Sequence, residues 1–178
     1  DFLGIPAKIV STPAELTTVS HLILPGVGAF PKGMKNLRDS GLAEAIIECV
    51  NKNQPFLGIC LGMQLLATIG YEGEETQGLN LIPGTVSQLP NEEVHVPHVG
   101  WNTVVPAKDN RLFKESADFY FVHSYHFIVD SEDYVIGRTV HGIEFVSAIN
   151  IGKVFGTQFH PEKSQTAGLA LLKSFSQI

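Results

Sequence analysis

The sequence predicts an α/β fold, with a mixed and mostly parallel sheet flanked by helices and a β-rich second half. Short apolar runs alternate with helical patterns through the first half of the 178 residues, and buried strands that alternate with helices form parallel pairs. Strand-like segments dominate the second half. Because the sequence contains no internal repeat, linker or low-complexity tract, we expect residues 1–178 to form a single domain.

The first half is expected to contain three short buried strands and two helices. The strands correspond to apolar runs at residues 7–10, 22–24 and 56–59. The first helix begins at the segment TPAE, residues 12–15, which has the form of a capping box with proline in the first turn. The second helix covers residues 34–50 by its periodicity, with Gly41 as a weak point inside it.

The second half is expected to consist of strands followed by a final helix at residues 166–175. The strand-like segments are 79–89, 96–105, 118–129, 134–140 and 143–159. Within the last segment, Asn-Ile-Gly at residues 150–152 is expected to form a hairpin turn. At the other end of the chain, "DFLGIPAKIV" is typical of the tail of a helix, a glycine stop and a strand. We therefore expect that a preceding strand and helix are missing from this sequence.

Composition narrows the classes of partner and the location. The hydrophobic content is 44% and the net charge is −6, and an acidic chain without a Lys/Arg cluster is not expected to bind nucleic acid or an anionic membrane. No apolar stretch is long enough to span a bilayer, and no signal-peptide pattern opens the sequence. The two cysteines, Cys49 and Cys60, do not make a disulfide framework in a chain of this length, which indicates a reducing, cytoplasmic setting.

The segment "PFLGICLGMQLL" places a cysteine between two glycines where a strand is expected to meet a helix. The spacing Gly58-x-Cys60-x-Gly62 is that of the nucleophile elbow of hydrolases, with sulfur in place of oxygen. Such a turn strains the backbone, and side chains at the glycine positions would collide with it. The helix start favours the thiolate by up to about 2 kcal/mol, so full activation needs a cationic partner as well. The alternative is that Cys60 is a small core residue.

The segment "TQFHPEKS" supplies a candidate base. Pro161 biases His160 towards an extended conformation, and residues two apart in an extended segment point the same way. Glu162 can therefore orient the imidazole and stabilise its protonated form, which leaves the other ring nitrogen for a thiol, as in a nucleophile–base–carboxylate triad. Taken alone, the segment also fits a surface histidine at the end of a strand.

Backbone amides at two expected strand ends are candidates for an oxyanion hole. The amide of Leu61 follows the cysteine directly. The segment "LILPGVGAF" ends another expected parallel strand, and its two glycines, Gly26 and Gly28, leave the backbone free to present the amides of Val27 and Gly28 nearby. The same segment fails as a phosphate-binding loop, because it has no Walker lysine and reaches Pro31 where a third glycine would be needed.

Histidine pairs and the second cysteine are weaker candidates. His95 and His98, like His123 and His126, lie three residues apart in expected strands, where such residues face opposite sides of the sheet. No metal site is therefore expected. Cys49 lies within a helical pattern and is expected to be a core residue.

Taken together, "LPGVGAF", "PFLGICLGMQLL" and "GTQFHPEKS" resemble the class I (triad) glutamine amidotransferases. The segments "GLNLIPGTV", "VPHVGWN" and "YFVHSYHF" narrow the match to the branch of that family that serves histidine biosynthesis. The resemblance covers nearly the whole chain in the family's order and spacing, and it implies a flavodoxin-like α/β fold that hydrolyses glutamine without a cofactor or metal. The family begins with a strand that carries an Asp-Tyr-Gly-x-Gly-Asn-like segment and then a helix, and this sequence contains neither.

The resemblance implies a role for each residue of a catalytic centre. Cys60 would attack the side-chain amide of glutamine, His160 would shuttle the proton and Glu162 would orient His160. The oxyanion would be held by the amide of Leu61 and, after the backbone of residues 25–28 reorients, by the amide of Val27.

The same resemblance implies a set of glutamine-binding residues. These residues are Gly28, Gln64, Glu72, Ser124 and Tyr125. The assignment of Glu72 is open, because Glu74 and Glu75 stand close to it in an expected loop.

A protein partner is implied as well. In this branch of the family the ammonia enters a cyclase subunit with a (β/α)8 barrel, so a heterodimer is expected. Pro97, Trp101, Tyr120 and Lys163 match positions near that interface. Without the resemblance, the aromatic residues would be expected to pack in the core, since an aromatic pair and a lysine are an unusual surface choice unless they face a partner.

Three other functions compete with this one. A glutaminase that serves another acceptor enzyme, such as an amidotransferase of surface-sugar synthesis, would differ only in the acceptor. A cysteine hydrolase of related architecture would act on peptides. A non-enzymatic binding module would contain an unreactive cysteine at position 60.

Overall fold

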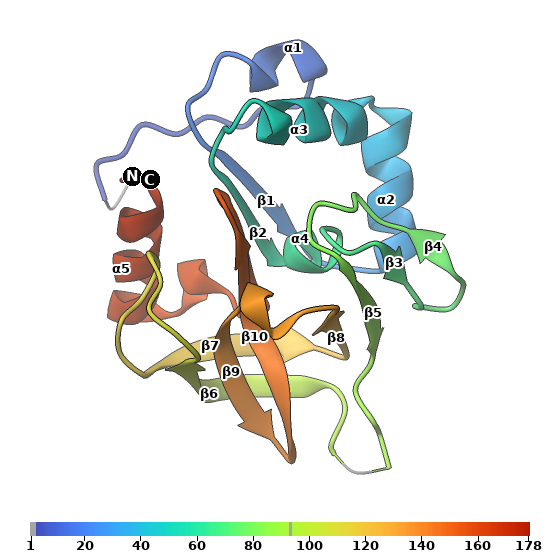
Figure 1. The fold of residues 1–178 in the computed structure, drawn as a ribbon, viewed down its shortest axis with the longest axis vertical. Helices are drawn as coiled ribbons and strands as arrows, with labels where there is room; N and C mark the ends of the chain where they lie inside the picture. Colours follow the sequence, from blue (N-terminus) through green and yellow to red (C-terminus); the bar gives the residue numbers. More distant parts are fainter. Residues whose placement is uncertain (1–2, 93) are drawn as a thin grey trace.

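The strands of this protein form one curled mixed sheet in residues 3–92 and 94–178, the part of the chain that the computed structural model describes (Figure 1). The strand order along the main path is β1-β2-β11-β10-β8-β5-β3-β4, while β9 joins β10 and β6 links β9 to β7. The strands are β1 (Leu22–Gly26), β2 (Phe56–Cys60), β3 (Ile69–Gly70), β4 (Thr76–Gln77), β5 (Gly84–Gln88), β6 (His98–Pro106), β7 (Ala117–His123), β8 (Tyr125–Val129), β9 (Val135–His141), β10 (Ile143–Ile151) and β11 (Val154–Thr157). The helices are α1 (Pro13–Leu16), α2 (Phe30–Asp39), α3 (Leu42–Asn51), α4 (Leu61–Gln64) and α5 (Gln165–Phe175), with short 3-10 helices η1 (Glu132–Tyr134) and η2 (Pro161–Lys163).

The sheet is mixed, and its parallel part holds the strand ends that matter for function. Parallel pairs join β1 to β2, β2 to β11 and β3 to β5, while the other pairs in the described residues are antiparallel. The α/β class and the β-rich second half are therefore confirmed. Antiparallel pairs outnumber parallel ones, contrary to expectation, because most strands after β4 are joined without a crossover helix.

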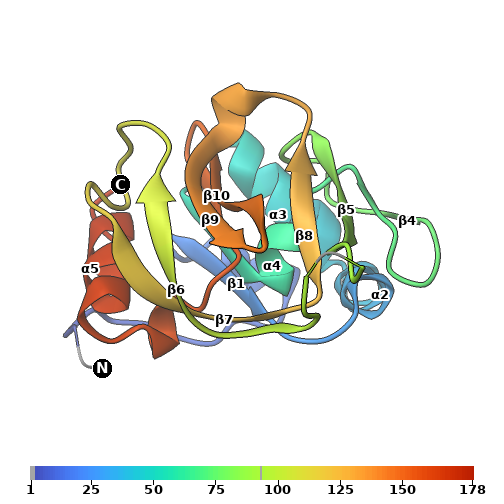
Figure 2. The same cartoon turned by 90° about the horizontal axis from the view of Figure 1, so that it is seen from below.

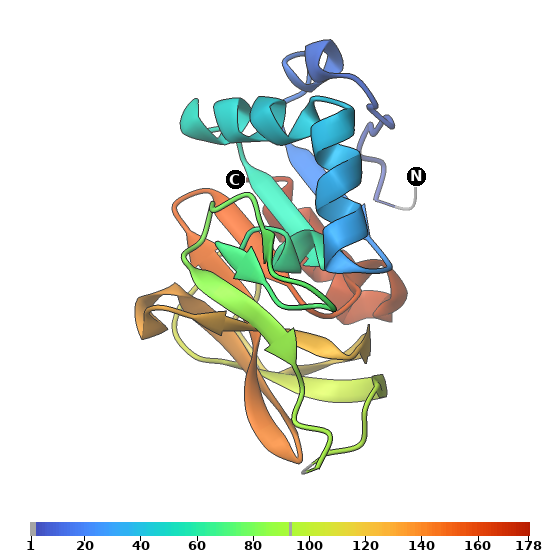
Figure 3. The ribbon, with the colours of Figure 1, turned by 90° about the vertical axis from the view of Figure 1, so that its right-hand side faces the viewer.

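Two apolar cores lie on opposite faces of the sheet. On one face, α2 and α3 pack over β1 and β2 (Figure 3), and this core includes Phe30, Met34 and Ile46. On the other face, α5 and β7 enclose a phenylalanine-rich core that includes Phe119 and Phe155. In Figure 2, α5 and β4 lie at opposite ends of the molecule with the curled sheet between them. Because both faces of the central sheet are covered, every residue of β2 is buried, which explains its continuous apolar sequence.

The strand expected at residues 7–10 is wrong. No strand forms there, and the side chain of Ile9 is 95% exposed. A strand needs a hydrogen-bonded neighbour, and in the described residues β1 pairs only with β2. The expected strands at 22–24 and 56–59 are confirmed as β1 and β2. Residues 1 and 2 of the expected helix tail lie outside the described residues.

The single helix expected at residues 34–50 is two helices, α2 and α3. Gly41 lies between them in a left-handed conformation with φ of 71°, which an L-residue adopts only at a cost. The weak point noted in the sequence is therefore a break. The capping box is confirmed, since the Glu15 carboxylate accepts a hydrogen bond from the Thr12 backbone amide at 3.0 Å.

The strand-like segments expected in the second half are confirmed, although residues 118–129 form two strands, β7 and β8, and residues 79–89 become a strand only at Gly84. The final helix is confirmed as α5. The hairpin turn falls at Gly152-Lys153, slightly later than expected, with Gly152 at φ of 57°. None of the helices in the described residues is long and apolar enough to cross a membrane.

Candidate active site

Cys60 lies on a tight turn between β2 and α4. Its backbone has φ of 55° and ψ of −111°, a strained conformation for a residue other than glycine. The two neighbouring glycines are required by close approach: a Cβ on Gly58 would lie 2.4 Å from the Gly62 carbonyl oxygen, and a Cβ on Gly62 would lie 1.8 Å from the Leu24 carbonyl oxygen. The elbow expected from the sequence is therefore confirmed, with a strained backbone placing the cysteine at the end of a parallel strand.

The helix expected after the cysteine forms, but it is short. Helix α4 covers only Leu61–Gln64, so few peptide dipoles are aligned behind Cys60. The macrodipole grows with the number of aligned peptides, and the contribution of this helix to a thiolate is smaller than the sequence suggested. Activation of the thiol therefore depends even more on a cationic neighbour.

His160 and Glu162 form a direct pair. The Nδ1 atom of His160 lies 2.7 Å from Oε1 of Glu162, and the side chain of His160 is only 3% exposed. The pairing is as expected, and His160 itself is extended as predicted, with φ of −100° and ψ of 94°. The expectation that the extended conformation continues to Glu162 is wrong. The chain enters η2 at Pro161, because proline suits the first turn of a helix, and this turn brings the carboxylate back to the ring.

The groups around His160 favour the protonated form of its imidazole. The neighbouring Cys60 and the hydrogen bond to Glu162 raise the pKa of His160 to about 9, against the opposing effect of burial. Burial alone would raise the pKa of Glu162, but the hydrogen bond from His160 and the nearby charges of His160 and Lys163 hold it below its ordinary value. At neutral pH the site therefore favours a carboxylate beside an imidazolium, which is the cationic partner that a thiolate requires.

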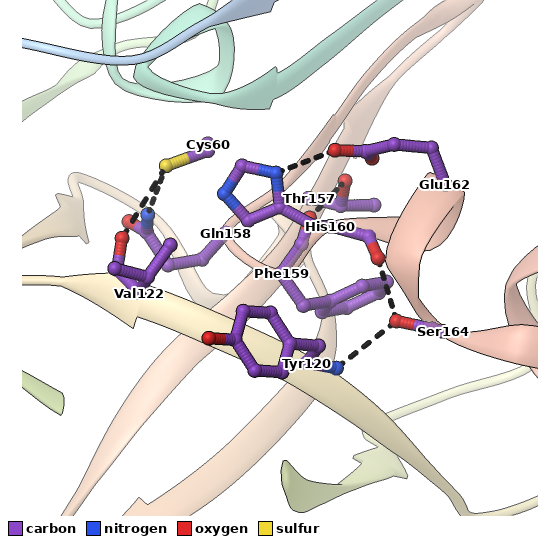
Figure 4. A network of polar contacts seen from close by, with 9 residues as sticks. All are labelled: Cys60, Tyr120, Val122, Thr157, Gln158, Phe159, His160, Glu162 and Ser164. Carbon is purple, nitrogen blue, oxygen red and sulfur yellow. Dashed lines mark hydrogen bonds and ion pairs between the residues drawn. The ribbon is translucent and has the colours of Figure 1, made fainter. Parts of the chain in front are cut away.

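The sulfur of Cys60 makes two long contacts with neighbouring polar groups. Its Sγ atom lies 3.8 Å from the carbonyl oxygen of Val122 and 3.7 Å from Nε2 of Gln158. Nε2 of His160 is buried without a hydrogen-bond partner, and Figure 4 shows the imidazole between Cys60 and Glu162. A hydrogen bond between the thiol and this ring nitrogen would complete a cysteine–histidine–glutamate triad.

The expected oxyanion residues are brought to the same place. Gly26 is paired in register with Cys60 across the two parallel strands, and a Cβ on Gly26 would lie 3.1 Å from the Cβ of Leu61. Val27, the next residue, is 77% exposed, and Gly28 has φ of 112°. The loop is therefore next to the nucleophile and open to solvent, while its role as an oxyanion hole stays a prediction.

Two expected substrate-binding side chains already have protein partners. Gln64 is buried, and its Nε2 donates to the carbonyl oxygen of Tyr125 at 2.9 Å and to Oε1 of Gln158 at 3.1 Å. Glu72 accepts a hydrogen bond from the backbone amide of Phe30 at 2.7 Å, and so holds the start of α2 immediately after the Gly28 loop. Both contacts fix these side chains near the elbow, and their contact with glutamine stays a prediction.

The remaining substrate candidates differ in position. Ser124 lies between β7 and β8, where its carbonyl oxygen accepts from the amide of Leu89 at 2.9 Å. Tyr125 begins β8 and is half-buried. Glu74 and Glu75, the alternatives to Glu72, are exposed and make no contact with the first turn of α2 comparable to that of Glu72.

Three of the expected partner residues, Trp101, Tyr120 and Lys163, lie together on one face beside the site. Trp101 is 49% exposed and packs edge-to-face with Tyr120, its register partner across β6 and β7, with ring centroids 6.2 Å apart. Nζ of Lys163 lies 5.7 Å from the centre of the Tyr120 ring, and Pro97 is exposed. The backbone amide of His160 donates to the carbonyl oxygen of Tyr120 at 2.9 Å. This face is therefore directly connected to the base, although its use as an interface stays a prediction.

The sequence interpretation missed two residues that contact the triad. Gln158 lies two positions before His160, and the period of two that was applied to Glu162 would have found it on the same side. Ser164 donates from Oγ to the His160 carbonyl oxygen at 2.6 Å and accepts from the Tyr120 amide at 3.0 Å. No local pattern marks Ser164, because its partners come from β7 and from before η2.

The histidines that meet in the structure come from different expected pairs. His98 and His123, from different expected pairs, meet with Nδ1 of His98 2.9 Å from Nε2 of His123. Within the described residues, no group of three or more histidine, cysteine or acidic side chains is placed to hold a metal ion. Cys49 is buried in the core, where burial raises the pKa of its thiol, so it is a packing residue as expected.

The titration of His160 tests the electrostatics of this site. We expect its pKa to fall from about 9 when Cys60 is replaced by alanine, and to fall less in Glu162→Gln, because Cys60 is the larger cause of the shift. A raised folded-state pKa stabilises the fold fully below the unfolded value of about 6.5, and that contribution is lost as pH rises through about 9. NMR titration of the His160 ring protons would measure the shift. Titration of wild-type His160 near its unperturbed value would contradict it, and His123, with a pKa lowered to about 3 by burial, is the internal control.

Fold and site together define a class of protein before any comparison is made. An α/β sheet that carries a cysteine on a strained strand-to-helix turn, opposite a histidine paired with a glutamate, has the architecture of cysteine-dependent amide hydrolases. The sequence matches the family described as "Glutamine amidotransferase class-I" over residues 3–177. The chain belongs to this family, as the sequence motifs suggested.

Comparison with individual relatives indicates the branch of the family. The imidazole glycerol phosphate synthase subunit HisH of Moorella thermoacetica is 46% identical over 181 residues, which cover 100% of this chain and 86% of that protein. The HisH subunit of Geobacter sulfurreducens is 41% identical over 185 residues, covering 99% and 88%. A crystal structure of a glutamine amidotransferase superposes with a TM-score of 0.77 over 98% of this chain and 89% of that chain, at 23% identity. The last comparison supports the fold, and the first two confirm the branch of the family.

Proposed function

We propose that this chain is the glutaminase subunit of imidazole glycerol phosphate synthase and that it hydrolyses L-glutamine to glutamate and ammonia for histidine biosynthesis. The observation that carries the chemistry is the pairing of the buried His160 with Glu162, which leaves a free ring nitrogen that faces Cys60 on its strained turn. The acceptor enzyme is supported by the full-length similarity to HisH subunits, which favours it over a partner in surface-sugar synthesis.

Hydrolysis of glutamine would proceed in two stages, through a thioester on Cys60. Nε2 of His160 holds the proton of the Cys60 thiol as an imidazolium, and the thiolate attacks the side-chain carbonyl carbon of glutamine. The negative charge on the carbonyl oxygen is held by the amide of Leu61 and by that of Val27 after residues 25–28 reorient. Collapse of this intermediate breaks the carbon–nitrogen bond, and the leaving nitrogen takes the proton from His160 and departs as ammonia. Water, deprotonated by the same histidine, then attacks the thioester and releases glutamate and the thiol.

Side-chain atoms that have no hydrogen-bond partner within the protein remain available to contact glutamine. Both protons on Nε2 of Gln64 are used by protein oxygens, so Gln64 would meet glutamine through its Oε1 atom as an acceptor. Gly28, Ser124 and Tyr125 would line the same pocket. Glu72, held at the start of α2 by its bond to Phe30, would attract the positively charged amino group of glutamine.

The partner would be a (β/α)8-barrel cyclase subunit in a cytoplasmic heterodimer. The exposed Trp101 and the half-buried Tyr120, together with Pro97 and Lys163, would form its docking face, since aromatic residues are enriched at interfaces. Because the Tyr120 carbonyl accepts from the His160 amide, docking on this face would act on the position of the base. Ammonia released beside this face would pass to the cyclase without entering bulk water.

The proposal predicts partner-dependent glutamate release. With labelled glutamine, the chain mixed with the (β/α)8 cyclase of histidine biosynthesis is expected to release glutamate at least about tenfold faster than the chain alone, because the 25–28 loop must reorient before the oxyanion is held. A (β/α)8 enzyme from an unrelated pathway is the matched control and is expected to have no effect. Equal turnover with and without the cyclase would contradict the dependence on the partner. Stimulation by a sugar-pathway acceptor instead would assign the chain to that alternative.

A further inference from the structure

A continuous line of buried hydrogen bonds leads from the nucleophile into the sheet. Nε2 of Gln158 contacts Sγ of Cys60 at 3.7 Å, and its Oε1 accepts from Nε2 of Gln64 at 3.1 Å. Gln64 in turn donates to the Tyr125 carbonyl oxygen at 2.9 Å. Gln158 is fully buried, so water does not compete for these bonds and each one is stronger than it would be at the surface.

The direction of each bond in this line is determined by chemistry. A backbone carbonyl can only accept, so Gln64 must present its NH2 group to Tyr125. The second proton of that NH2 group then points to Gln158, which must accept it with its side-chain oxygen. If the Gln158 amide were turned over, two NH2 groups would face each other. Its own NH2 group is therefore directed at the sulfur of Cys60.

The far end of the line is held by two neutral histidines. Nδ1 of His123 lies 2.9 Å from the same Tyr125 carbonyl oxygen, and therefore bears a proton. Its Nε2 must then accept from Nδ1 of His98 at 2.9 Å, and Nε2 of His98 accepts from Nδ2 of Asn102 at 3.2 Å. Burial lowers the pKa of His98 to about 4 and that of His123 to about 3, so both rings stay neutral at neutral pH and this direction does not reverse.

Val122 and Gln158 differ in the protonation state of the Cys60 sulfur that each can bind. The Val122 carbonyl oxygen at 3.8 Å can bind only a thiol, since it has no proton to donate and would repel a thiolate. The Gln158 NH2 group can donate to sulfur in either state, and its bond strengthens when the sulfur becomes charged. Of these two contacts, only the one from Gln158 survives the transfer of the thiol proton to His160.

We propose that Gln158 is the positioning residue of the nucleophile: its side-chain amide holds the Cys60 sulfur at the elbow and stays hydrogen-bonded to the thiolate when the proton has moved to His160. Gln64 fixes the orientation of that amide, so it acts on the sulfur through Gln158. The inference rests on the proposed function only in taking Cys60 as the nucleophile. It assigns to the Gln158 side chain a function beyond packing in the core.

Alkylation of Cys60 tests the proposal directly. In the isolated chain at pH 7.5, without glutamine or partner, iodoacetamide is expected to modify Cys60 about tenfold more slowly in Gln158→Met than in wild type. This factor corresponds to about 1.4 kcal/mol, the lower range for a hydrogen bond to a charged group. Gln158→Glu keeps an acceptor for Gln64 but places a carboxylate beside the sulfur, and is expected to be at least as slow. Peptide mass spectrometry separates Cys60 from Cys49.

A neighbouring substitution is the matched control. Thr157→Val removes a buried hydroxyl that donates to the Phe159 carbonyl oxygen at 3.2 Å and does not contact sulfur, so its alkylation rate is expected to stay within twofold of wild type. In the complex with the cyclase, Gln158→Met is expected to lower kcat with little change in KM, because the lost bond is made to the reacting atom.

The outcomes are separable from those of the proposed function. Wild-type alkylation rates in folded Gln158→Met and Gln158→Glu proteins, with circular dichroism and Tm as the check of folding, would overturn the proposal. If the methionine variant fails to fold, the isosteric glutamate variant decides alone. A chain that releases no glutamate with any partner would refute the proposed function, yet slow alkylation in both variants would still support the position of Gln158.

Discussion

Replacing Cys60 by alanine is expected to reduce glutamate release by the complex on the order of 10⁴-fold or more, which is the scale seen when an enzyme loses the nucleophile of a triad. The remaining rate would come only from substrate binding and from the oxyanion amides. Cysteine and alanine both have a Cβ atom, so the strained backbone of the elbow, with φ of 55°, is equally tolerated in the variant. Steady-state release of labelled glutamate, together with a folded circular dichroism spectrum, would measure this loss.

The second cysteine provides the control for this experiment. Cys49 lies in α3 and packs in the core on the face opposite α5. Cys49→Ala is expected to cost about 1 kcal/mol or more of unfolding free energy through the lost packing, while the rate of glutamate release stays unchanged. Retention of more than a few per cent of wild-type activity in Cys60→Ala would show that Cys60 is not the nucleophile.

Replacing Gly62 by alanine is expected to destabilise the fold by about 3 kcal/mol or more, at the upper end of overpacking effects. A Cβ at this position would lie 1.8 Å from the Leu24 carbonyl oxygen. That oxygen belongs to β1, which is held in register with β2, so it cannot move away without disturbing the parallel pair. Urea unfolding followed by circular dichroism would measure the loss, and low soluble yield would be its first sign.

Gly152→Ala separates this collision from the general cost of replacing a glycine. Gly152 has φ of 57°, and a Cβ there would meet no atom within 4 Å. Its substitution is expected to cost only about 1–2 kcal/mol, from the left-handed backbone alone. Gly62 is not among the glycines with positive φ, so its backbone conformation adds no cost of this kind. An equal loss of stability in Gly62→Ala and Gly152→Ala would therefore contradict the steric explanation of the elbow.

Local features of the fold were predictable because they depend on neighbouring residues. The capping box at residues 12–15 forms through the side chains of Thr12 and Glu15, and the hairpin turn uses the left-handed backbone that Gly152 permits. The fully apolar run of β2 correctly indicated a strand covered on both faces. The break at Gly41 was visible as a weak point, but whether a glycine bends, ends or merely weakens a helix depends on what the helix packs against.

Errors arose where a segment depends on a distant partner. Residues 7–10 have the composition of a strand, yet no strand lies beside them in the described residues. The helix after Cys60 contains good helix formers, yet it ends at Gln64, whose side chain is bound to β8 and to Gln158. The segment after His160 was expected to be extended, and η2 forms instead under the hydrogen bond from Ser164 to the His160 carbonyl oxygen.

By itself, the sequence determined the elbow at Cys60, because the two glycines and the strand before them specify a strained turn within a few residues. It also determined the continuous apolar run of β2, the class of fold and, through its motifs, the family. Only the tertiary structure decided that His160 faces Cys60, that Gln158 directs its amide at the same sulfur, and that His98 meets His123. These contacts depend on the register of β2, β6, β7 and β11, and register is set by the packing of the whole sheet, which no short stretch of sequence contains.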